Sequence, residues 1–165
     1  MADTINVTEM TQEGKEARIK ELNERKIETR NAISEQMKFA KSLGDFSENA
    51  ELDAAKAAYA ENEKAIERLE YELATAVIIK PKNFIILEKE NNEIVDVYIC
   101  KLVGETESDF LNHLISNSTP FGLEVVKHKK GDEFAIHEFK FTILEDEPKK
   151  VNEKELAKYK AKYNL

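Results

Sequence analysis

The chain of 165 residues is acidic: 33 Asp and Glu stand against 25 Lys and Arg, which gives a formal net charge of −8 at pH 7. This balance excludes a general binder of duplex DNA, because such affinity rests largely on neutralisation of phosphates by Lys and Arg. Any contact with nucleic acid must be local or made through another protein. Apolar residues make up 41% of the chain, enough for one or two modest cores.

The sequence shows no signal of export or of membrane insertion. No apolar run approaches the roughly 20 residues needed to cross a bilayer. Residues 1–9 are expected to form a disordered arm, and they do not place an apolar segment after a basic one. Cys100 is the single cysteine, so no internal disulfide can form. We therefore expect a soluble cytoplasmic protein.

Two long helices are predicted next. The first begins after an N-cap at Thr11 and runs to about Leu43, and the second runs from about Glu48 to Val77. Both segments are rich in Ala, Glu, Lys, Arg and Leu, and neither contains proline. Because only a tight turn separates them, they predict an antiparallel α-helical coiled-coil hairpin over residues 10–79, with arms of roughly 45 Å.

A seam with alternating spacings of three and four is predicted on each helix. On the first helix it consists of Ile19, Leu22, Lys26, Thr29, Ile33, Gln36, Ala40 and Leu43. On the second it consists of Leu52, Ala55, Tyr59, Asn62, Ile66, Leu69, Leu73 and Ala76. Lys26 can lay its methylenes along Leu69 and keep its amine in water. Asn62, opposite Ile33, either fixes the register at a cost in stability or is merely an imperfect heptad position. The small pair Ala40 and Ala55 narrows the rod near its tip.

The turn between the helices carries two carboxylates. Asp45 and Glu48 lie in residues 44–49, with the spacing of a capping box, and Gly44 is suited to end the first helix in a left-handed conformation. A structural role as caps and a chemical role at the tip are compatible. Two carboxylates make at most half of a Mg²⁺ site, because Mg²⁺ takes near-octahedral oxygen coordination. The other half would come from a partner that already holds a metal centre.

A second domain follows a linker at residues 80–83, where Pro81 stops the helical pattern. Short runs of β-branched and aromatic residues predict strands, and the expected strands are Phe84–Leu87, Ile94–Cys100, Lys101–Val103, Glu133–Ile136 and Phe139–Leu144. Thr119 and Pro120 predict the start of a short helix. The fold class is therefore α+β, with the hairpin followed by a small antiparallel β-sheet domain with a short helix at residues 84–145.

The tail, residues 146–165, has helical composition and six Lys against two Glu from position 149 onwards. A stripe of Leu156, Tyr159 and Tyr163 could dock it on the sheet. Two alternatives stay open: the helix covers apolar surface, or its lysines contact RNA or a partner. The three histidines show no spacing typical of metal ligands, and we expect them to be surface or half-buried residues.

The turn resembles a known signature. The run Gly44-Asp45-Phe46-Ser47-Glu48-Asn49-Ala50-Glu51 is similar to the Gly-Asp-x-x-Glu-Asn-Ala-Glu motif of the bacterial Gre family of transcript cleavage factors, in particular its GreA type. The resemblance begins at Met10-Thr11-x-x-Gly14 and resumes with Val103-Gly104, Glu107-x-Asp109, Ile115-Ser116, Thr119-Pro120 and Gly131-Asp132. It implies a second domain similar to FK506-binding proteins, which docks on the rim of the secondary channel of RNA polymerase while the hairpin enters that channel.

The resemblance also implies roles for single residues. Asp45 would be a metal ligand, and Glu48 a ligand or a group that orients water, both sharing Mg²⁺ with the polymerase. Lys41, Asn49 and Lys56 would lie near the RNA 3′ end or the polymerase, although the lysines can equally be solvated surface residues. The rim-docking loop would be Ser118, Thr119 and Pro120, where the first two residues depart from the usual Asp or Asn followed by Ser, so a helix cap is the rival explanation. Leu52 stands where an aromatic residue is usual.

The resulting hypothesis is a monomeric transcription elongation factor that stimulates Mg²⁺-dependent cleavage of backtracked nascent RNA by bacterial RNA polymerase. The factor would hold no Mg²⁺ tightly by itself and would not be a nuclease alone. One alternative is a regulator or inhibitor that enters the same channel without promoting cleavage. Another is a plain coiled-coil adaptor.

Overall fold

A computed structural model describes residues 7–42, 50–148 and 153–165. The chain divides into two compact units. The hairpin unit holds residues 13–76 together with the chain up to Thr8, and the sheet unit holds residues 9–12 and 77–165.

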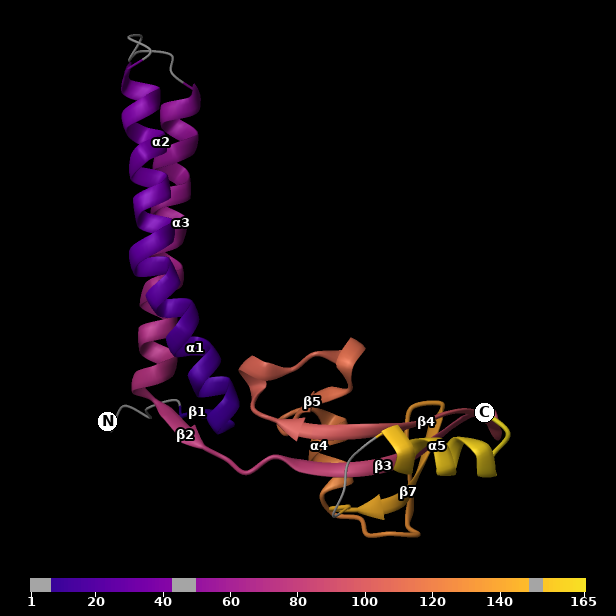
Figure 1. Ribbon diagram of the computed structural model, residues 1–165. Helices are drawn as coiled ribbons and strands as arrows, with labels where there is room; N and C mark the ends of the chain where they lie inside the picture. Colours follow the sequence, from indigo (N-terminus) through magenta and orange to yellow (C-terminus); the bar gives the residue numbers. More distant parts are fainter. Residues whose placement is uncertain (1–6, 43–49, 149–152) are drawn as a thin grey trace. The chain divides into compact units, whose positions relative to one another are not determined.

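The hairpin unit is built from two antiparallel helical arms (Figure 1). The first arm consists of α1 (Gln12–Glu24), a π-helical segment η1 (Arg25–Thr29) and α2 (Arg30–Ser42). The second arm is a single helix, α3 (Ala50–Ala74), whose 25 residues rise about 37 Å. The predicted helical hairpin is confirmed, and η1 is a feature that the sequence did not predict.

The arms bury a narrow apolar seam between them. Its most buried apolar members, each at most 6% exposed, are Ile33, Ala40, Leu52, Ala55, Ile66 and Leu69. The predicted seam is wrong at Ile19, which is 42% exposed, at Tyr59, which is 41% exposed, and at Gln36. At Ile19 the cause is η1, because a π-helical turn takes up one more residue than an α-helical turn and so shifts which residues of α1 face α3. Arg18, one position before Ile19, is the residue that reaches α3.

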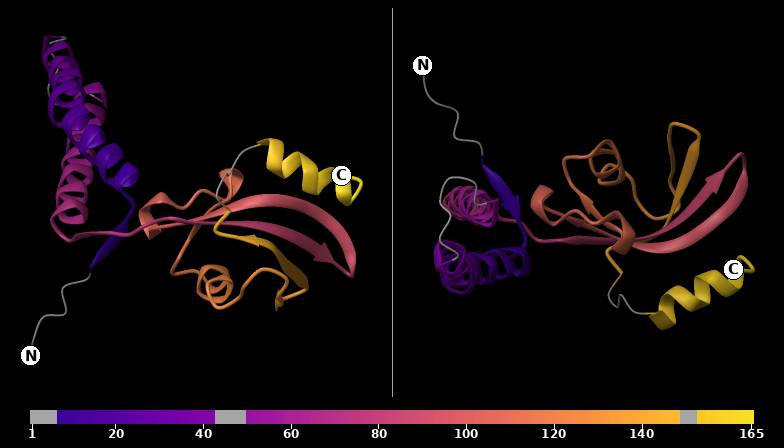
Figure 2. Two further views of the ribbon diagram at one scale, coloured as in Figure 1. Left: turned by 60° about the horizontal axis from the view of Figure 1, so that its bottom comes forward. Right: turned by 90° about the horizontal axis from the view of Figure 1, so that it is seen from above.

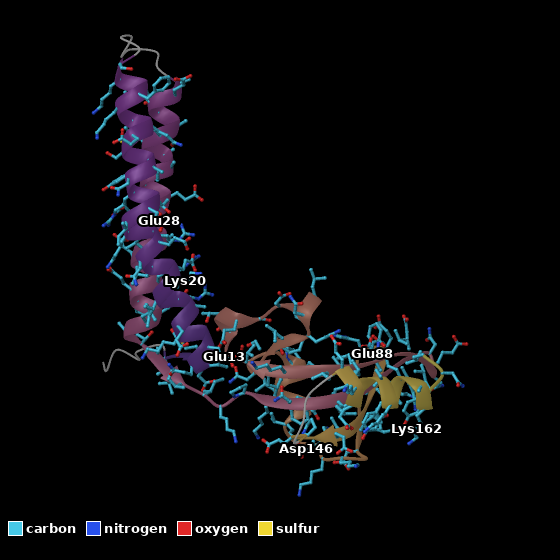
Figure 3. All side chains as sticks on the ribbon, in the orientation of Figure 1. Glu13, Lys20, Glu28, Glu88, Asp146 and Lys162 are labelled. Carbon is cyan, nitrogen blue, oxygen red and sulfur yellow. The ribbon has the colours of Figure 1, made fainter. Side chains whose placement is uncertain are left out.

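Ion pairs flank this seam along its length, and Figure 3 shows charged side chains on both arms. Arg30 donates to both carboxylate oxygens of Glu63, at 2.8 and 2.6 Å, and these hydrogen bonds lower the pKa of Glu63. The amine of Lys26 lies 2.5 Å from the carboxylate of Glu70, and both side chains are exposed, at 37% and 49%. At an exposed surface, a bidentate pair such as that of Arg30 with Glu63 constrains the orientation of the two helices more than it adds to their stability.

A two-stranded sheet follows the base of the arms, formed by β1 (Thr8–Met10) and β2 (Ala76–Ile78). The predicted disordered arm is therefore wrong at its last two residues, which are part of β1. The second helix was also predicted too long, since α3 ends at Ala74 rather than Val77. The physical reason is a run of β-branched residues that favours extended backbone: Thr75, Val77, Ile78 and Ile79.

The sheet unit contains a five-stranded sheet in the order β5-β4-β3-β7-β6. Its strands are β3 (Lys82–Glu90), β4 (Glu93–Val103), β5 (Leu114–Ser116), β6 (Glu133–Ile136) and β7 (Phe139–Asp146). The predicted strands are found, except that Ile94–Cys100 and Lys101–Val103 form one strand, β4. The predicted antiparallel sheet is wrong in one pair, because β5 runs parallel to β4. The segment before β3 is shorter than the linker predicted at residues 80–83, since Lys82 and Asn83 begin β3. Asn91 and Asn92, both with positive φ, make the tight turn between β3 and β4.

Both faces of this sheet are covered, which explains why the run Phe84–Leu87 is buried without a polar alternation. One face packs beneath α4 (Pro120–Val125) in a core that includes Phe84, Ile86 and Val125. The other face is covered by α5 (Glu153–Lys162) in the tail (Figure 2). There the predicted stripe of Leu156, Tyr159 and Tyr163 packs against Ile85, Leu87 and Val97.

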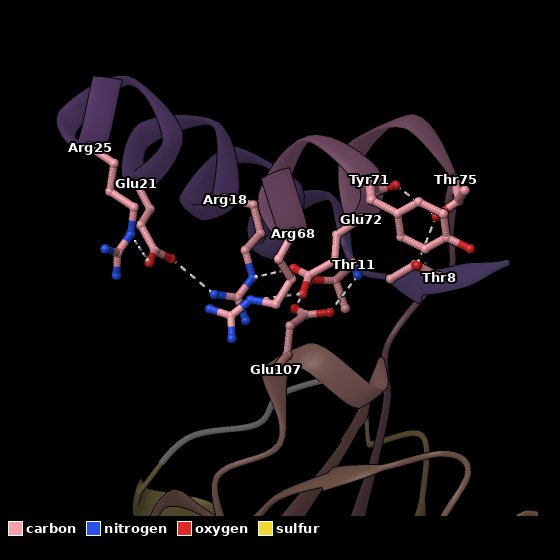
Figure 4. Close-up of polar contacts among 10 residues, drawn as sticks. All are labelled: Thr8, Thr11, Arg18, Glu21, Arg25, Arg68, Tyr71, Glu72, Thr75 and Glu107. Atoms are coloured by element: carbon pink, nitrogen blue, oxygen red, sulfur yellow. Dashed lines mark hydrogen bonds and ion pairs between the residues drawn. The ribbon is translucent and has the colours of Figure 1, made fainter. Parts of the chain in front are cut away.

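Residues 9–12 are fixed within the sheet unit by close polar contacts (Figure 4). The carboxylate of Glu107 accepts from the backbone N–H of Thr11 at 2.6 Å and also from its hydroxyl. Gly104 allows this approach, because a Cβ there would lie 1.9 Å from the carbonyl oxygen of Glu9. The short segment that precedes α1 is therefore held by the loop after β4.

Candidate functional site at the end of the hairpin

The predicted tip lies between the last residue of α2, Ser42, and the first residue of α3, Ala50. Asp45, Glu48 and Asn49, like the rest of the predicted capping box, lie outside the described residues. The helix dipoles of the two arms still bear on this segment, because α2 points its C-terminus and α3 its N-terminus toward it. An N-terminus favours carboxylates near it, and α3 carries Glu51 and Asp53 in its first turn.

Both predicted basic residues beside the tip are described and exposed. Lys41 lies in the last turn of α2, where a cation is favoured by the helix dipole. Lys56 lies in the second turn of α3, and its amine is 3.0 Å from the carboxylate of Asp53. Because Lys56 is 59% exposed and Asp53 is 77% exposed, this ion pair is weak. Lys56 can therefore leave Asp53 to bind another anion.

The ends of α2 and α3 also enclose a groove that sequence reasoning missed. It has a volume of about 690 Å³ and is lined by Glu35, Gln36, Phe39, Ala40, Glu51, Ala54, Ala55 and Ala58. Phe39 is 62% exposed beside it. The signal in the sequence was an aromatic residue outside the seam spacing, facing three alanines of the other arm. Leu52, by contrast, is buried in the seam at 5% exposure and presents no surface for stacking.

Ser118, Thr119 and Pro120 lie at the start of α4 in the sheet unit. The Thr119 hydroxyl accepts from the backbone N–H of Gly122 at 3.0 Å and donates to the carbonyl of Ser116 at 2.7 Å. The hydroxyl groups of Ser116 and Ser118 are 2.7 Å apart. Thr119 is thus a helix N-cap followed by proline, as the sequence predicted. The structure confirms the cap and leaves a docking role as a prediction.

His113, His128 and Cys100 are engaged in packing within the sheet unit. The part of the chain that the structure describes contains no group of three or more His, Cys, Asp and Glu that could hold a metal ion. His113 stacks on Tyr98 with ring centroids 4.3 Å apart, and His128 stacks on Phe134 at 4.8 Å. Burial raises the pKa of Cys100 to about 12, so this thiol is not a nucleophile at neutral pH. Among the helices of the described residues, none combines the length and apolar character that crossing a bilayer requires.

Comparison with known proteins assigns the chain to a family. Residues 8–78 match the family model described as transcription elongation factor, N-terminal, and residues 81–147 match the model of the GreA/GreB C-terminal part. The chain belongs to the GreA/GreB family of transcription elongation factors. It is 35% identical over 134 residues to Transcription elongation factor GreA of Staphylococcus aureus strain JH9, across 77% of this chain and 85% of that protein. The protein of the same name from strain Newman gives the same values.

Solved structures were also compared. One described as the structure of the transcription factor Gfh1 is 21% identical, with a TM-score of 0.37, and the match covers 87% of this chain and 99% of that chain. The Gfh1 protein of Thermus thermophilus gives 21% identity and a TM-score of 0.35, over 87% of this chain and all of that chain. The second family model ends at residue 147, so α5 lies beyond the part of the chain that the two models match.

Proposed function

We propose that this GreA/GreB family member rescues arrested transcription by stimulating RNA cleavage in bacterial RNA polymerase. The end of the hairpin would enter the secondary channel of the polymerase, and the polymerase would cut its own backtracked nascent RNA. The observation that carries the proposal is that, in a member of this family, the sequence between the last residue of α2 and the first residue of α3 contains both Asp45 and Glu48. A plain adaptor could use these carboxylates as helix caps, so the assay below decides between the two roles.

The tip fits Mg²⁺ as a shared ligand set rather than as a complete site. Carboxylate oxygens are the ligands that Mg²⁺ takes in proteins, but two of them leave most of its coordination unfilled. When bound, Mg²⁺ supplies activation of the attacking oxygen or stabilisation of the leaving oxygen in two-metal phosphodiester chemistry. Asp45 would be a direct ligand, and Glu48 a ligand or the group that orients the attacking water. Because the polymerase would supply the remaining ligands, the protein would not be a nuclease alone.

The residues beside the tip would act on the RNA. Lys41 and Lys56 are exposed on the last turn of α2 and the second turn of α3, where an amine can meet a phosphate of the RNA 3′ end. Lys56 would exchange its exposed pair with Asp53 for this contact. Asn49 offers an amide next to the two acids. These contacts would position the RNA, whereas its sequence would not be read.

The sheet unit would dock on the rim of the channel through Ser118, Thr119 and Pro120. Their hydroxyl groups are largely engaged within the loop, so the surface that a partner meets is a rigid turn rather than free side chains. The protein would act as a monomer in the cytoplasm, where the polymerase works.

A cleavage assay tests the proposal. The protein and Mg²⁺ are added to a stalled, backtracked elongation complex of the cognate polymerase with RNA labelled at its 3′ end. We expect release of short 3′ fragments, and a loss of about 10²- to 10³-fold in rate for Asp45→Asn and for Glu48→Gln. Glu67→Gln is the matched control, because it removes an exposed carboxylate of α3 outside the quoted motif and should leave the rate close to that of the unchanged protein.

The other outcomes separate the alternatives. Inhibition of transcription without fragment release would identify a regulator that enters the channel without promoting cleavage. If the protein has no effect on any complex of the cognate polymerase, both the cleavage factor and the non-cleaving regulator are excluded. The coiled-coil adaptor would then remain. Lys41→Ala and Lys56→Ala should each weaken cleavage more than Lys38→Ala, whose exposed amine pairs with Glu35 on the same helix.

A further inference from the structure

The π-helical segment η1 interrupts the first arm at a defined point. The backbone N–H of Arg30 donates to the carbonyl of Arg25, five residues back, where an α-helix would make this bond four residues back. A π-helical segment takes up one additional residue, so the helices before and after it can both keep their orientation toward a partner helix. Here α1 and α2 both keep a face toward α3: Arg18 of α1 reaches Glu72, and Ile33 of α2 lies in the seam.

Asn62 of α3 binds the first residue of this segment. Its side-chain amide is 3% exposed and donates to the carbonyl oxygen of Arg25 at 3.2 Å, and its own oxygen lies 3.5 Å from the Arg25 guanidinium. A second contact steadies that guanidinium, since its Nε donates to Glu21 at 2.9 Å. The hydrogen bonds of Asn62 therefore go to a residue about two helical turns before Ile33, its predicted neighbour.

Apolar packing around this contact is incomplete. A groove of about 610 Å³ opens at the same place, and its lining includes Arg25, Thr29, Ile33 and Asn62. Ile27, the apolar residue within η1, is 61% exposed and does not enter the seam. Of the polar contacts between η1 and α3 described above, those of Asn62 are buried and reach a backbone carbonyl, whereas the ion pair of Lys26 with Glu70 joins exposed side chains.

Loss of η1 would misalign the arm. If the same residues formed a regular α-helix, the chain beyond them would advance by about 1.5 Å and rotate by about 100°. The seam residues of α1 and those of α2 could then not both face α3. The segment carried by α2, which leads to the tip, would turn with it.

We propose that Asn62 is a positioning residue, which holds η1 in its π-helical form and thereby sets the rotation and register at which the hairpin presents its tip. The consequence for RNA cleavage rests on the proposed function, whereas the consequence for register does not. Asn62 is far along the arm from the tip and acts only through η1 and α2.

Two variants test this proposal together. In Asn62→Leu the amide is lost, so η1 should relax toward a regular α-helix. Deletion of Glu28, an exposed residue of η1, removes the additional residue and makes a regular helix compatible with the original alignment. We expect Asn62→Leu to lower the cleavage rate by about 10²-fold, since small misplacements of reacting groups have effects of this size. Deletion of Glu28 in the Asn62→Leu background should restore cleavage.

The register is measured separately from activity. Spin labels on Lys20→Cys and Glu35→Cys flank η1 on exposed sites of α1 and α2, and the buried Cys100 does not react. In Asn62→Leu the distance between labels should change by several ångströms, because a rotation of about 100° moves a label that stands off the helix axis. The double variant should return to the original distance.

Two matched controls test whether the effects are specific to Asn62 and to the additional residue of η1. Asn23→Leu, at an exposed asparagine of α1, should change neither distance nor cleavage. Deletion of Lys38, in the regular part of α2, should not rescue Asn62→Leu. An unchanged label distance in Asn62→Leu overturns the proposal, and so does a double variant that recovers neither distance nor cleavage. If Asn62→Leu does not fold, recovery in the double variant decides in the same way. An unchanged protein without cleavage activity would refute the proposed function, while the distances would still test the register.

Discussion

The contacts inside the hairpin unit differ in kind from the contacts inside the sheet unit. In the sheet unit, Phe84, Ile86 and Ile143 are at most 2% exposed and belong to one continuous apolar core. In the hairpin unit the buried side chains form one narrow row along the seam, and this row includes the polar Asn62. Ion pairs such as that of Arg30 with Glu63 flank the row.

This difference follows from shape. A pair of long helices has a large surface for its volume, so few of its residues can be surrounded by apolar neighbours on all sides. Apolar contacts along such a seam repeat every turn and are compatible with more than one register. The polar contacts of the hairpin unit therefore determine alignment, whereas the core of the sheet unit determines stability. For the proposed function, in which the hairpin presents its tip to the polymerase, alignment matters more than stability.

The largest expected effect compares the same substitution in the two units. Ile86→Ala should lower the free energy of unfolding of the sheet unit by about 4 kcal/mol, because Ile86 is fully buried and its neighbours cannot close the cavity. Ile33→Ala should cost the hairpin unit about 2 kcal/mol, since Ile33 borders an open groove that already admits water. Hydrogen exchange at increasing urea concentrations measures both, through the amides of α2 and α3 for the hairpin and those of β3 and β7 for the sheet. Equal losses would contradict the comparison.

The same contrast explains what could be predicted from the sequence. The apolar run Phe84–Leu87 and the pair Thr119 and Pro120 predicted β3 and α4, because these signals are local. The strand β5 was missed, since it has three residues and its parallel pairing with β4 is set by a distant segment. The segment η1 was also missed, because the predicted seam runs through Lys26 and Thr29 without an interruption. No local pattern encodes which register a long seam adopts.

The candidate site was predicted unevenly for a related reason. Lys41 and Lys56 were placed on exposed helix surfaces near the tip, as helical spacing requires, and the Thr119 cap was found at its predicted residue. The roles of Asp45 and Glu48 remain predictions, because these residues lie outside those described. The groove beside Phe39 could not be predicted, since it depends on how two distant arms face one another.

A smaller effect separates two roles of one residue in the sheet unit. Thr119→Ala removes the N-cap of α4 and should lower the free energy of unfolding by about 1 kcal/mol. Thr119→Ser keeps the hydroxyl and should restore most of that stability. Binding to immobilised polymerase is then measured for both variants. If binding follows stability, Thr119 acts as a cap. A serine variant that is stable but binds more weakly would show that the methyl group is part of the docking contact.

The smallest effect concerns α5, where a polar pair supplements apolar packing. The Tyr159 hydroxyl donates to Glu145 at 2.5 Å, and hydrogen bonds from Lys130 and Tyr159 hold the pKa of Glu145 below its ordinary 4.5. Burial and Glu145 raise the pKa of Tyr159 from 10.0 to about 12. A lowered carboxyl pKa contributes stability that is full above about pH 4.5 and is lost as the pH falls through the lowered value. A raised tyrosine pKa contributes stability that is full below about pH 10 and is lost as the pH rises through about 12.

Docking of α5 should therefore be tightest between these two limits. Hydrogen exchange of the amides of α5 measures it as a function of pH, and protection should fall toward both ends of the range. Tyr159→Phe should weaken the alkaline limb, because it removes the phenol that is hydrogen-bonded to Glu145. A weaker acid limb should persist, since Asp96 still accepts from Lys160 at 2.8 Å. The effect is small because these groups are partly exposed and screened by solvent. Protection that stays constant with pH would mean that the apolar contacts of Leu156 and Tyr163 hold α5 without the polar pair, as the core of the sheet unit does.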